Sequence, residues 1–341
     1  MTSSINLPPL NAGALGLTMK ACCAKAQMPP KDLSFAGQTA IITGSNIGIG
    51  LTAARMLLEK NLSHLIMSVR SANKGEAAAS ELRKKFPFAK IEVWSLDMLS
   101  YDSIQKFAAR CSALPRIDFV ILNAGVAKET FDLAPTGHEE SIQVNYLSTA
   151  LLAILLLPVL RAKKIDGKAR TLSIVNSGTA MMTKFKEHGN VPLLPSFDDG
   201  KTFDLLDRYA VSKVLGHLFM VKLAESVRKE DVIVNLVDPG LTKGTNLHGG
   251  LSAPIRAIMG VAKTMTGRPI EQGASTYIQA VTRGEETHGS FLMDWTITPF
   301  ASIIYTPEGK AATERLWTET LDDLEFAGVH SILSSMQSGS R

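Results

Sequence analysis

A tyrosine and a lysine stand four residues apart in the stretch YAVSK, at Tyr209 and Lys213. If this stretch is helical, residues i and i+4 share a face, so the ammonium lies beside the phenol. A free phenol has a pKa of about 10 and exchanges a proton poorly at neutral pH, whereas a neighbouring positive charge favours the phenolate. The spacing therefore predicts a proton-transfer pair. The alternative is a solvated pair in which Tyr209 only packs.

Three glycines, Gly44, Gly48 and Gly50, lie in the stretch TGSNIGIG (43–50), directly after the apolar run TAIIT (39–43). At such a place a strand turns tightly into a helix, and side chains would collide with a pyrophosphate that approaches the backbone. The helix N-terminus supplies N–H groups and a positive dipole for the anion. We therefore predict a nucleotide-binding turn, with a plain glycine-rich turn as the alternative.

The end of the second apolar strand indicates which nicotinamide cofactor such a turn would bind. An acidic residue there would bind the ribose 2′-hydroxyl of NAD, whereas an arginine can pair with the 2′-phosphate of NADP. The stretch SHLIMSVRSANKGE (63–76) has Arg70 at this point and no acid at the strand end. We predict NADP; the alternative is that Arg70 is an ordinary surface charge.

Apolar strands alternate with helical stretches along the chain, which is the pattern that would position these residues. The expected strands are 39–43, 63–69, 90–94, 118–122, 172–175 and 231–237, and the expected helices between them include 53–60, 74–86 and 103–111. Near-continuous apolar strands separated by helices require a parallel sheet covered on both faces. We predict an α/β protein with a doubly wound parallel sheet, a Rossmann fold with right-handed crossovers.

Composition excludes several other classes of function. Of 341 residues, 45% are hydrophobic and 20% charged, as in an ordinary globular protein, and the net charge of +4 comes with no basic window that carries interleaved aromatics. We therefore expect no nucleic-acid partner. Three cysteines cannot form a disulfide framework, and seven scattered histidines show no ligand spacing, so we expect no metal.

Two apolar segments bear on domain boundaries and location. Residues 1–34 lack a basic start and are interrupted by Lys20, so we interpret them as a flexible extension. The run LLAILLLPVL (151–160) is about half the length of a bilayer span and contains Pro158, which indicates a buried helix at the core or a subunit interface. We expect one domain at 35–330, a C-terminal tail at 331–341 and a cytoplasmic location, with membrane association not excluded.

Six ordered motifs across roughly residues 36–300 resemble those of the short-chain dehydrogenase/reductase family. They are the turn TGxxxGxG, LNAG (122–125), VNYLS (144–148), SIVNSGTA (173–180), YAVSK (209–213) and DPGLTKGT (238–245). The C-terminal part looks like that of the retinol-dehydrogenase-like branch of the family. The nearest relatives that this resemblance suggests are fungal members of that branch, several of which belong to secondary-metabolite pathways.

The resemblance implies roles for four residues. Tyr209 would be the general acid/base, and Lys213 would tune its pKa and donate to the nicotinamide ribose. Ser177 would hold the carbonyl oxygen, although relatives usually show two adjacent serines where this chain has Asn176 and Ser177; in the other register Gly178 would take the catalytic place. Asn145 would lie in a helix bent around a water that links the lysine to solvent.

The resemblance also implies which residues hold the cofactor. Asp97 would contact adenine, the segment from Asn123 would line the adenosine, and Thr242 would lie near the nicotinamide amide. The full expected set is Gly44, Ser45, Asn46, Ile47, Gly48, Ile49, Arg70, Asp97, Met98, Asn123, Ala124, Gly125, Tyr209, Lys213, Pro239, Gly240, Leu241 and Thr242.

Two variable segments indicate what kind of substrate the protein would bind. Residues 181–204 lengthen the gap between Ser177 and Tyr209, which indicates an insertion near the mouth of the site. Residues 247–267 mix small and apolar residues at helical spacing and are interpreted as a lid, with Met259 and Met265 facing substrate or core.

Together these segments suggest a bulky, lipophilic ketone or alcohol, reduced or oxidised with NADP. The alternatives are a non-redox cyclisation or isomerisation on the same fold, and a nucleotide-sensing protein. By resemblance, the helix with the apolar run 151–160 and the helix starting at Tyr209 would pack two subunits into a homodimer.

Overall fold

The computed structural model describes residues 3–10, 13, 16, 24–165, 167–205, 207–245, 260, 263–264 and 266–338. Most of the expected lid, with Met259 and Met265, lies outside these residues. The strands are β1 (Thr39–Thr43), β2 (His64–Val69), β3 (Lys90–Ser95), β4 (Phe119–Leu122), β5 (Arg170–Val175), β6 (Val232–Val237), β7 (Ser290–Met293) and β8 (Thr296–Thr298).

These strands form one sheet in the order β3-β2-β1-β4-β5-β6-β7-β8. All neighbours pair in parallel except β7 and β8, which are antiparallel. This is the doubly wound sheet predicted from the sequence. The final hairpin was not predicted, because β7 is four fully buried residues long and β8 only three, too short for a periodicity to be visible.

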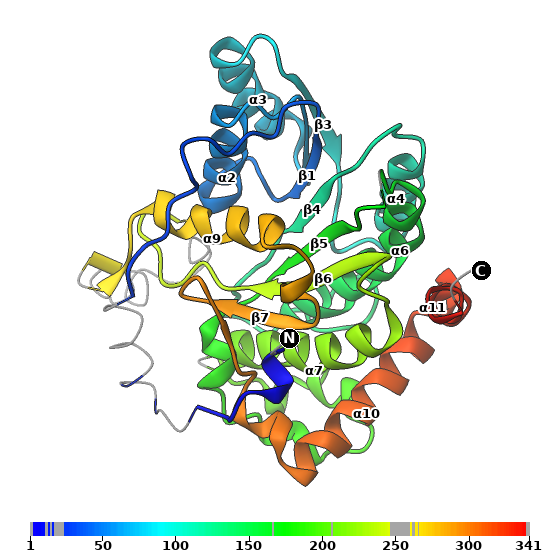
Figure 1. Cartoon of the computed structure of the whole chain (residues 1–341). Coiled ribbons are helices and arrows are strands. Elements are labelled where there is room, and N and C mark those ends of the chain that lie inside the picture. Colours follow the sequence, from blue (N-terminus) through cyan, green and yellow to red (C-terminus); the bar gives the residue numbers. More distant parts are fainter. Residues whose placement is uncertain are drawn as a thin grey trace.

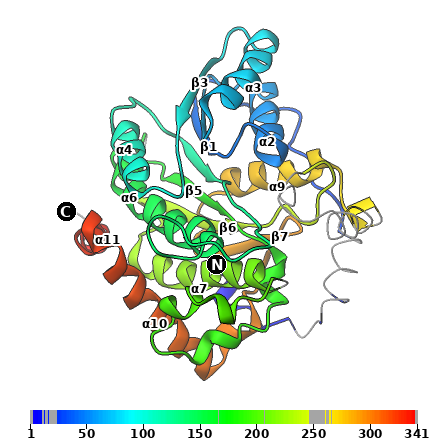
Figure 2. The same ribbon diagram turned by 180° about the vertical axis from the view of Figure 1, so that it is seen from behind.

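Helices cover both faces of the sheet (Figures 1 and 2). On one face lie α2 (Gly48–Glu59), α3 (Ala72–Lys85) and α9 (Ile270–Thr282), and on the other lie α4 (Tyr101–Ser112), α6 (Ser148–Ala162) and α7 (Arg208–Ser226). A hydrophobic core lies on each face of the sheet, and alternate residues of β1 pack into one or the other. Ile41 belongs to the core beneath α6 and α7, and Ile42 to the core beneath α2. This alternation is the physical reason that every residue of β1 is buried.

The remaining elements are short or C-terminal. They are η1 (Ser4–Asn6), α5 (Glu140–Ile142), the π-helical turn η2 (Gln143–Leu147), η3 (Gly178–Met181), η4 (Lys186–Gly189), η5 (Leu194–Phe197), η6 (Gly200–Thr202), η7 (Gly284–Thr287), η8 (Ser302–Tyr305), α10 (Pro307–Asp323), η9 (Glu325–Ala327) and α11 (Val329–Gln337).

Both chain ends differ from the expected extension and tail. Ser4 is fully buried; its hydroxyl donates to the Thr298 carbonyl at 2.6 Å and accepts from the Phe291 N–H at 2.7 Å. The expected boundary at residue 330 falls inside α11, which buries Leu333 and Met336 in the main core. The tail prediction was wrong for residues 331–337, because their apolar positions lie on the inner face of a helix.

The apolar run 151–160 lies in the buried helix that the sequence indicated. The helical stretch 140–162 is long and apolar enough to span a membrane, yet 83% of its most apolar window is buried inside the protein. Within the same chain, α10 packs along α7 and α11 along α6. Those are the two helices for which the resemblance implies a subunit contact, so the surfaces that touch α10 and α11 cannot contact a second copy. A homodimer stays a prediction.

Candidate active site

The tyrosine and lysine singled out by their spacing lie in the first turns of α7, near the carboxyl end of β5. Lys213 is 5% exposed, its ammonium donates to the Val175 carbonyl at 3.2 Å, and its Nζ lies 5.7 Å from the centre of the Tyr209 ring. The two side chains therefore share one face of the helix, as the spacing predicted.

Ser177 follows β5 and caps the short turn η3. Its hydroxyl oxygen accepts from the Thr179 N–H at 3.2 Å and lies 3.0 Å from the Thr179 hydroxyl. It also hydrogen bonds with the Tyr209 phenol. A Cβ at Gly178 would instead lie 3.2 Å from the Met293 sulfur and 3.4 Å from an Asp238 oxygen. The structure thus brings Ser177 to Tyr209 and directs Gly178 elsewhere.

Asn176, which stands where relatives usually have a serine, has a positioning contact that the sequence did not reveal. Its side-chain nitrogen donates to the Lys213 carbonyl at 3.1 Å, and its side-chain oxygen accepts from the Ser177 N–H at 2.7 Å. One amide side chain therefore fixes Ser177 relative to the helix that carries Lys213.

Asn145 lies in the π-helical turn η2, so the expected irregularity of its helix is present. Its side chain exchanges two hydrogen bonds with the Val126 backbone, both 2.8 Å long, and donates to the Ser212 hydroxyl at 2.9 Å. A Cβ at Gly125 would lie 3.1 Å from the Asn145 oxygen and 3.8 Å from Lys213 Nζ. Gly125 thus lets Asn145 and Lys213 approach each other.

The electrostatics of the pair differ from the simple expectation that Lys213 lowers the tyrosine pKa. Burial raises the pKa of Tyr209, and the Asp238 charge acts in the same direction. The hydrogen bond with Ser177 lowers this pKa but does not outweigh the other two effects. Burial also lowers the pKa of Lys213 to about 8, against the effect of Asp238. Desolvation dominates here because both groups lie in a low-dielectric site. The raised pKa accordingly favours the protonated phenol of Tyr209.

Asp238 is a site residue to which the sequence analysis assigned no role. It is 6% exposed, and its carboxylate accepts the N–H of Gly240 at 2.9 Å and that of Gly178. Burial raises its pKa to about 6, although these hydrogen bonds and the Arg268 charge oppose the shift. The carboxylate thus joins the turn after β5 to the turn after β6. The sequence feature that could have indicated this role is an acidic residue between a buried strand and Pro239-Gly240.

The glycine turn has the geometry that a pyrophosphate requires. Gly44 and Gly48 have φ angles of 64° and 61°, in the left-handed region. A Cβ at Gly44 would lie 3.0 Å from the Ala124 Cα, while a Cβ at Gly48 would meet no atom within 4 Å, so space is open in front of it. Helix α2 begins at Gly48 without a side-chain cap from Ile47, which leaves its N–H groups for an anion.

The other residues of this turn have separable roles. Ser45 is buried and donates to the Ile42 carbonyl at 2.9 Å, which stabilises the turn. Asn46 and Ile49 are partly exposed, and Ile47 is 51% exposed. Their contacts with a bound dinucleotide stay a prediction.

Asn123 braces the turn instead of projecting from it. Its side-chain nitrogen donates to the Thr43 carbonyl at 2.8 Å and to the Gly44 carbonyl at 3.1 Å, and its oxygen accepts from the Tyr277 hydroxyl at 2.9 Å. The N–H groups of Asn123 and Ala124 both donate to the Thr43 hydroxyl at 2.9 Å. The side chain of Asn123 therefore shapes the site through the backbone.

Arg70 and Asp97 follow neighbouring parallel strands, at the edge of the sheet where the glycine turn lies. Arg70 is exposed directly after β2. The Asp97 carboxylate accepts the Leu99 N–H at 3.0 Å, while Met98 is buried. Ligands of open α/β sheets bind at this edge. The contact of these two charged side chains with the adenosine half of a dinucleotide stays a prediction.

The segment after β6 has an anchor that was not foreseen. Thr242 is buried and its hydroxyl donates to the Gly240 carbonyl at 2.9 Å. The N–H of Arg268 donates to the Leu241 carbonyl at 2.8 Å, and the Arg268 guanidinium lies 2.6 Å from Asp294. The hairpin between β7 and β8 thereby holds the segment that starts at Pro239.

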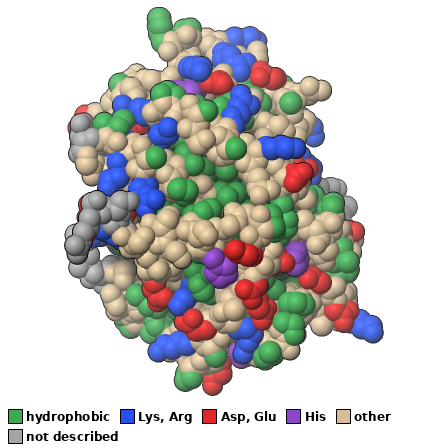
Figure 3. Space-filling model, turned by 90° about the vertical axis from the view of Figure 1, so that its right-hand side faces the viewer, with side chains coloured by type: hydrophobic (Ala, Val, Ile, Leu, Met, Phe, Trp, Pro, Cys, Tyr) green, Lys and Arg blue, Asp and Glu red, His purple; other side chains and the backbone are tan. Residues whose placement is uncertain are grey.

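Apolar side chains are exposed beside these groups. Met182 is 46% exposed and Leu241 36%. On the face drawn in Figure 3, hydrophobic side chains gather across the middle, with charged side chains above and below. Among the described residues, no group of three His, Cys, Asp or Glu side chains is placed to hold a metal ion.

Comparisons with known proteins agree with this geometry. The model of the family described as short chain dehydrogenase matches residues 38–184. The chain is 50% identical to the short chain dehydrogenase/reductase mfmJ of Annulohypoxylon moriforme, with 92% of each chain covered. It is 47% identical to the short chain dehydrogenase virL of Hypocrea virens, with 90% of this chain and 91% of virL covered. Among solved structures, the Pseudomonas aeruginosa RhlG/NADP complex has a TM-score of 0.59 at 21% identity and covers 77% of this chain and 97% of RhlG.

Proposed function

The chain belongs to the short-chain dehydrogenase/reductase family, and we propose that it reduces a carbonyl group on a lipophilic small molecule with NADPH. The observation that carries this proposal is the meeting of Ser177, Tyr209 and Lys213 beside the glycine turn. A carbonyl reduction needs a hydride on carbon, a proton on oxygen, and a hydrogen bond to the oxygen as charge develops there.

The bound nicotinamide would supply the hydride. Tyr209 would donate its proton to the substrate oxygen, and the burial that raises its pKa keeps the phenol protonated at neutral pH. The Ser177 hydroxyl would donate a hydrogen bond to the same oxygen. Lys213, charged below its pKa of about 8, would stabilise the phenolate that remains and hold the cofactor ribose. The contact between Ser177 and Tyr209 favours reduction over the non-redox alternative, which depended on an unfilled serine position.

NADPH is proposed instead of NADH for a chemical reason. Arg70 is exposed after β2 and can pair with a 2′-phosphate, and no acid stands at the strand end to hold a 2′-hydroxyl. The solved structure of RhlG, a structural neighbour, is a complex of that protein with NADP.

The substrate class and setting are part of the same proposal. Exposed Met182 and Leu241 support an apolar substrate. Fungal relatives and the resemblance to secondary-metabolite dehydrogenases support a role in such a pathway. We also propose a cytoplasmic location, because the most apolar helical stretch, 140–162, is largely buried inside the protein.

The test is cofactor oxidation by purified protein with NADPH or NADH over a panel of bulky ketones. We expect turnover with NADPH, and a loss of roughly 10²- to 10⁴-fold in kcat for Tyr209→Phe, since general acid catalysis contributes that much. NADPH binding, followed by fluorescence, should be retained in this variant. Turnover that survives in Tyr209→Phe would contradict the assigned acid, and NADPH binding without turnover of any ketone would contradict the reductase.

A further inference from the structure

The insertion at 181–204 starts and ends beside the proposed catalytic residues. It leaves the turn of Ser177 and returns at Arg208, the neighbour of Tyr209. Its base is closed by the Lys184 N–H, which donates to Asp207 at 3.2 Å. Although its sequence is mostly polar, it buries Phe185 and Phe197. The insertion is thus a folded segment with its own apolar contacts.

Arg208 connects the insertion to the catalytic helix. It is 1% exposed, and its guanidinium lies 5.0 Å from the centre of the Phe197 ring and 5.5 Å from that of Phe203. Both phenylalanines belong to the insertion. A displacement of the insertion would therefore separate the Arg208 guanidinium, next to Tyr209, from the two aromatic rings that cover it.

Helix α10 holds the insertion through Arg315, whose guanidinium donates to the His188 and Asn190 carbonyls at 3.1 and 3.0 Å, and through Glu319. The two carboxylate oxygens accept the Leu193 N–H at 2.9 Å each, and one also accepts the Leu194 N–H at 2.7 Å. Both leucines are buried, with 0% and 2% exposure. Without Glu319, two buried N–H groups would lose their acceptor.

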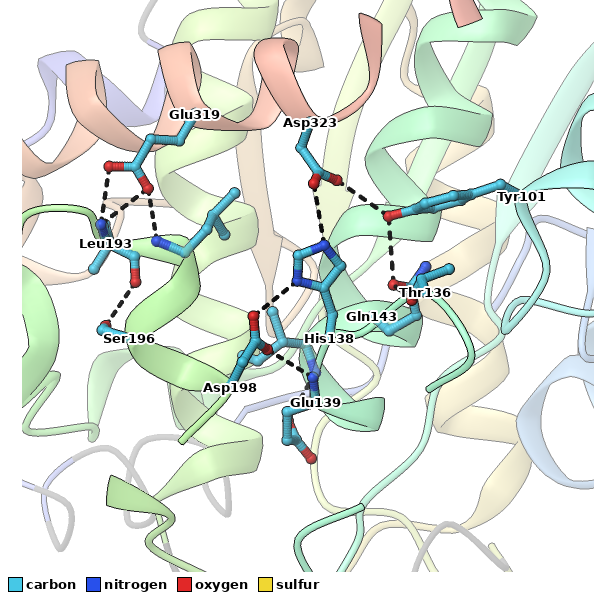
Figure 4. A network of polar contacts seen from close by, with 12 residues as sticks. Tyr101, Thr136, His138, Glu139, Gln143, Leu193, Ser196, Asp198, Glu319 and Asp323 are labelled. Carbon is cyan, nitrogen blue, oxygen red and sulfur yellow. Dashed lines mark hydrogen bonds and ion pairs between the residues drawn. The ribbon is translucent and has the colours of Figure 1, made fainter. Parts of the chain in front are cut away.

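One turn further along α10, Asp323 holds the insertion through His138 (Figure 4). The His138 ring lies between Asp323, 3.1 Å from one nitrogen, and Asp198 of the insertion, 3.0 Å from the other. Asp198 also accepts the Glu139 N–H at 2.8 Å. Only a protonated imidazole donates to both carboxylates. Since Glu319 and Asp323 are four residues apart, one face of α10 makes both attachments.

We propose that Glu319 and the Asp323–His138–Asp198 bridge fix the insertion as a rigid wall of the substrate site, and thereby set the preference for bulky over small ketones. This proposal rests on the proposed function. The residues are positioning residues, because they act through the insertion and not on the reacting atoms. An insertion held in one position retains its contacts with Arg208, so the wall beside Tyr209 has one shape.

The test compares Glu319→Gln with Glu314→Gln on the same helix. Glu314 pairs with Lys222 and is 67% exposed, so it is a matched carboxylate whose ion-pair partner lies outside the insertion. Amide hydrogen exchange of residues 193–198 reports the attachment. The ratio of kcat/KM for a bulky and a small ketone, with the KM for NADPH, reports the substrate wall.

For Glu319→Gln we expect exchange at Leu193 and Leu194 to accelerate about tenfold or more, because a glutamine cannot accept both N–H groups with a charge. The bulky-to-small ratio should fall roughly fivefold, mainly through KM, with the KM for NADPH unchanged. Glu314→Gln should change none of these. Unchanged exchange overturns the attachment, and faster exchange with an unchanged ratio overturns the role in specificity.

A second pair of variants guards against misfolding of Glu319→Gln. Asp323→Asn should accelerate exchange in the insertion, while Asp322→Asn, whose side chain is 70% exposed, should not. If the wild-type protein turns over no ketone, the proposed function fails, and the exchange data alone then support or overturn the attachment.

Discussion

The cofactor side and the substrate side of this molecule are held in place by different means. The glycine turn is shaped by backbone geometry and by short-range contacts from Thr43 and Asn123. The insertion is held by charged side chains from α10, more than a hundred residues away in the chain. The difference teaches that the cofactor side depends on the backbone geometry of its glycines, whereas the substrate side depends on charged side chains that can be neutralised or titrated.

The largest effect that tests this comparison is expected for Gly44→Ala. Its φ of 64° is costly for alanine, and the new Cβ would lie 3.0 Å from the Ala124 backbone. We expect NADPH affinity to fall by roughly 100-fold, because such a site tolerates little displacement. The control is Gly137→Ala, which has a φ of 94° but meets no atom within 4 Å. An equal loss of NADPH affinity in both variants, measured by fluorescence titration, would contradict a specific role for Gly44.

Arg70→Ala should sharpen the comparison, since it removes the charge on the cofactor side that the 2′-phosphate would meet. We expect the ratio of kcat/KM for NADPH over NADH to fall roughly tenfold or more, as one charge-assisted hydrogen bond is lost. Lys74→Ala, a nearby cation in the first turn of α3, is the control. A preserved ratio in Arg70→Ala would assign the cofactor preference elsewhere.

Asp238→Asn should change the pH dependence more than the maximal rate. The Asp238 carboxylate, with a pKa of about 6, raises the pKa of Tyr209 and supports the protonated form of Lys213. Its removal lowers both pKa values, because the negative charge that disfavours the Tyr209 phenolate and favours the Lys213 ammonium is gone. The alkaline limb of reduction should therefore move to lower pH.

At pH 8.5 the Asp238→Asn variant should be roughly two- to fivefold slower than wild type, relative to their rates at pH 7. The measurement is kcat/KM across pH 6–10. A limb that stays in place would show that Asp238 only joins the two turns.

The smallest expected effect concerns the stability supplied by His138. Burial disfavours its charge, but Asp198 and Asp323 outweigh burial and raise the pKa from 6.5 to about 9. A group whose pKa is raised on folding stabilises the folded state fully when the pH is below its pKa in the unfolded chain. This stabilisation is lost as the pH rises through its pKa in the folded protein. His138→Gln should therefore lower the free energy of unfolding by about 1–2 kcal/mol at pH 6.

This difference should shrink as the pH rises through about 9. Urea denaturation at pH 6, 8 and 10 measures it, and His330→Gln, in which a half-exposed histidine is replaced, is the control. A difference that stays constant with pH would show that His138 acts by packing alone.

The parts of the site that were predictable lie within single motifs. The predicted strands match β1 to β6 within one residue at each end, except that β5 starts two residues earlier than expected. Tyr209 and Lys213 share a face because helix geometry requires it. The sequence did not predict the features that depend on distant segments. These are the contact of the Asp238 carboxylate with Gly178, the pairing of the short strands β7 and β8, and the attachment of the insertion to Glu319.

By itself the sequence determined the order of strands and helices, the glycine turn and the Tyr209–Lys213 pair, because each depends on residues within a few turns of one another. Only the tertiary structure decided that Ser177 and not Gly178 meets Tyr209, that burial keeps the phenol neutral, and that α10 and α11 cover α7 and α6. These outcomes depend on which groups lose water and which side chains meet across the fold, and such contacts leave no periodicity in the chain.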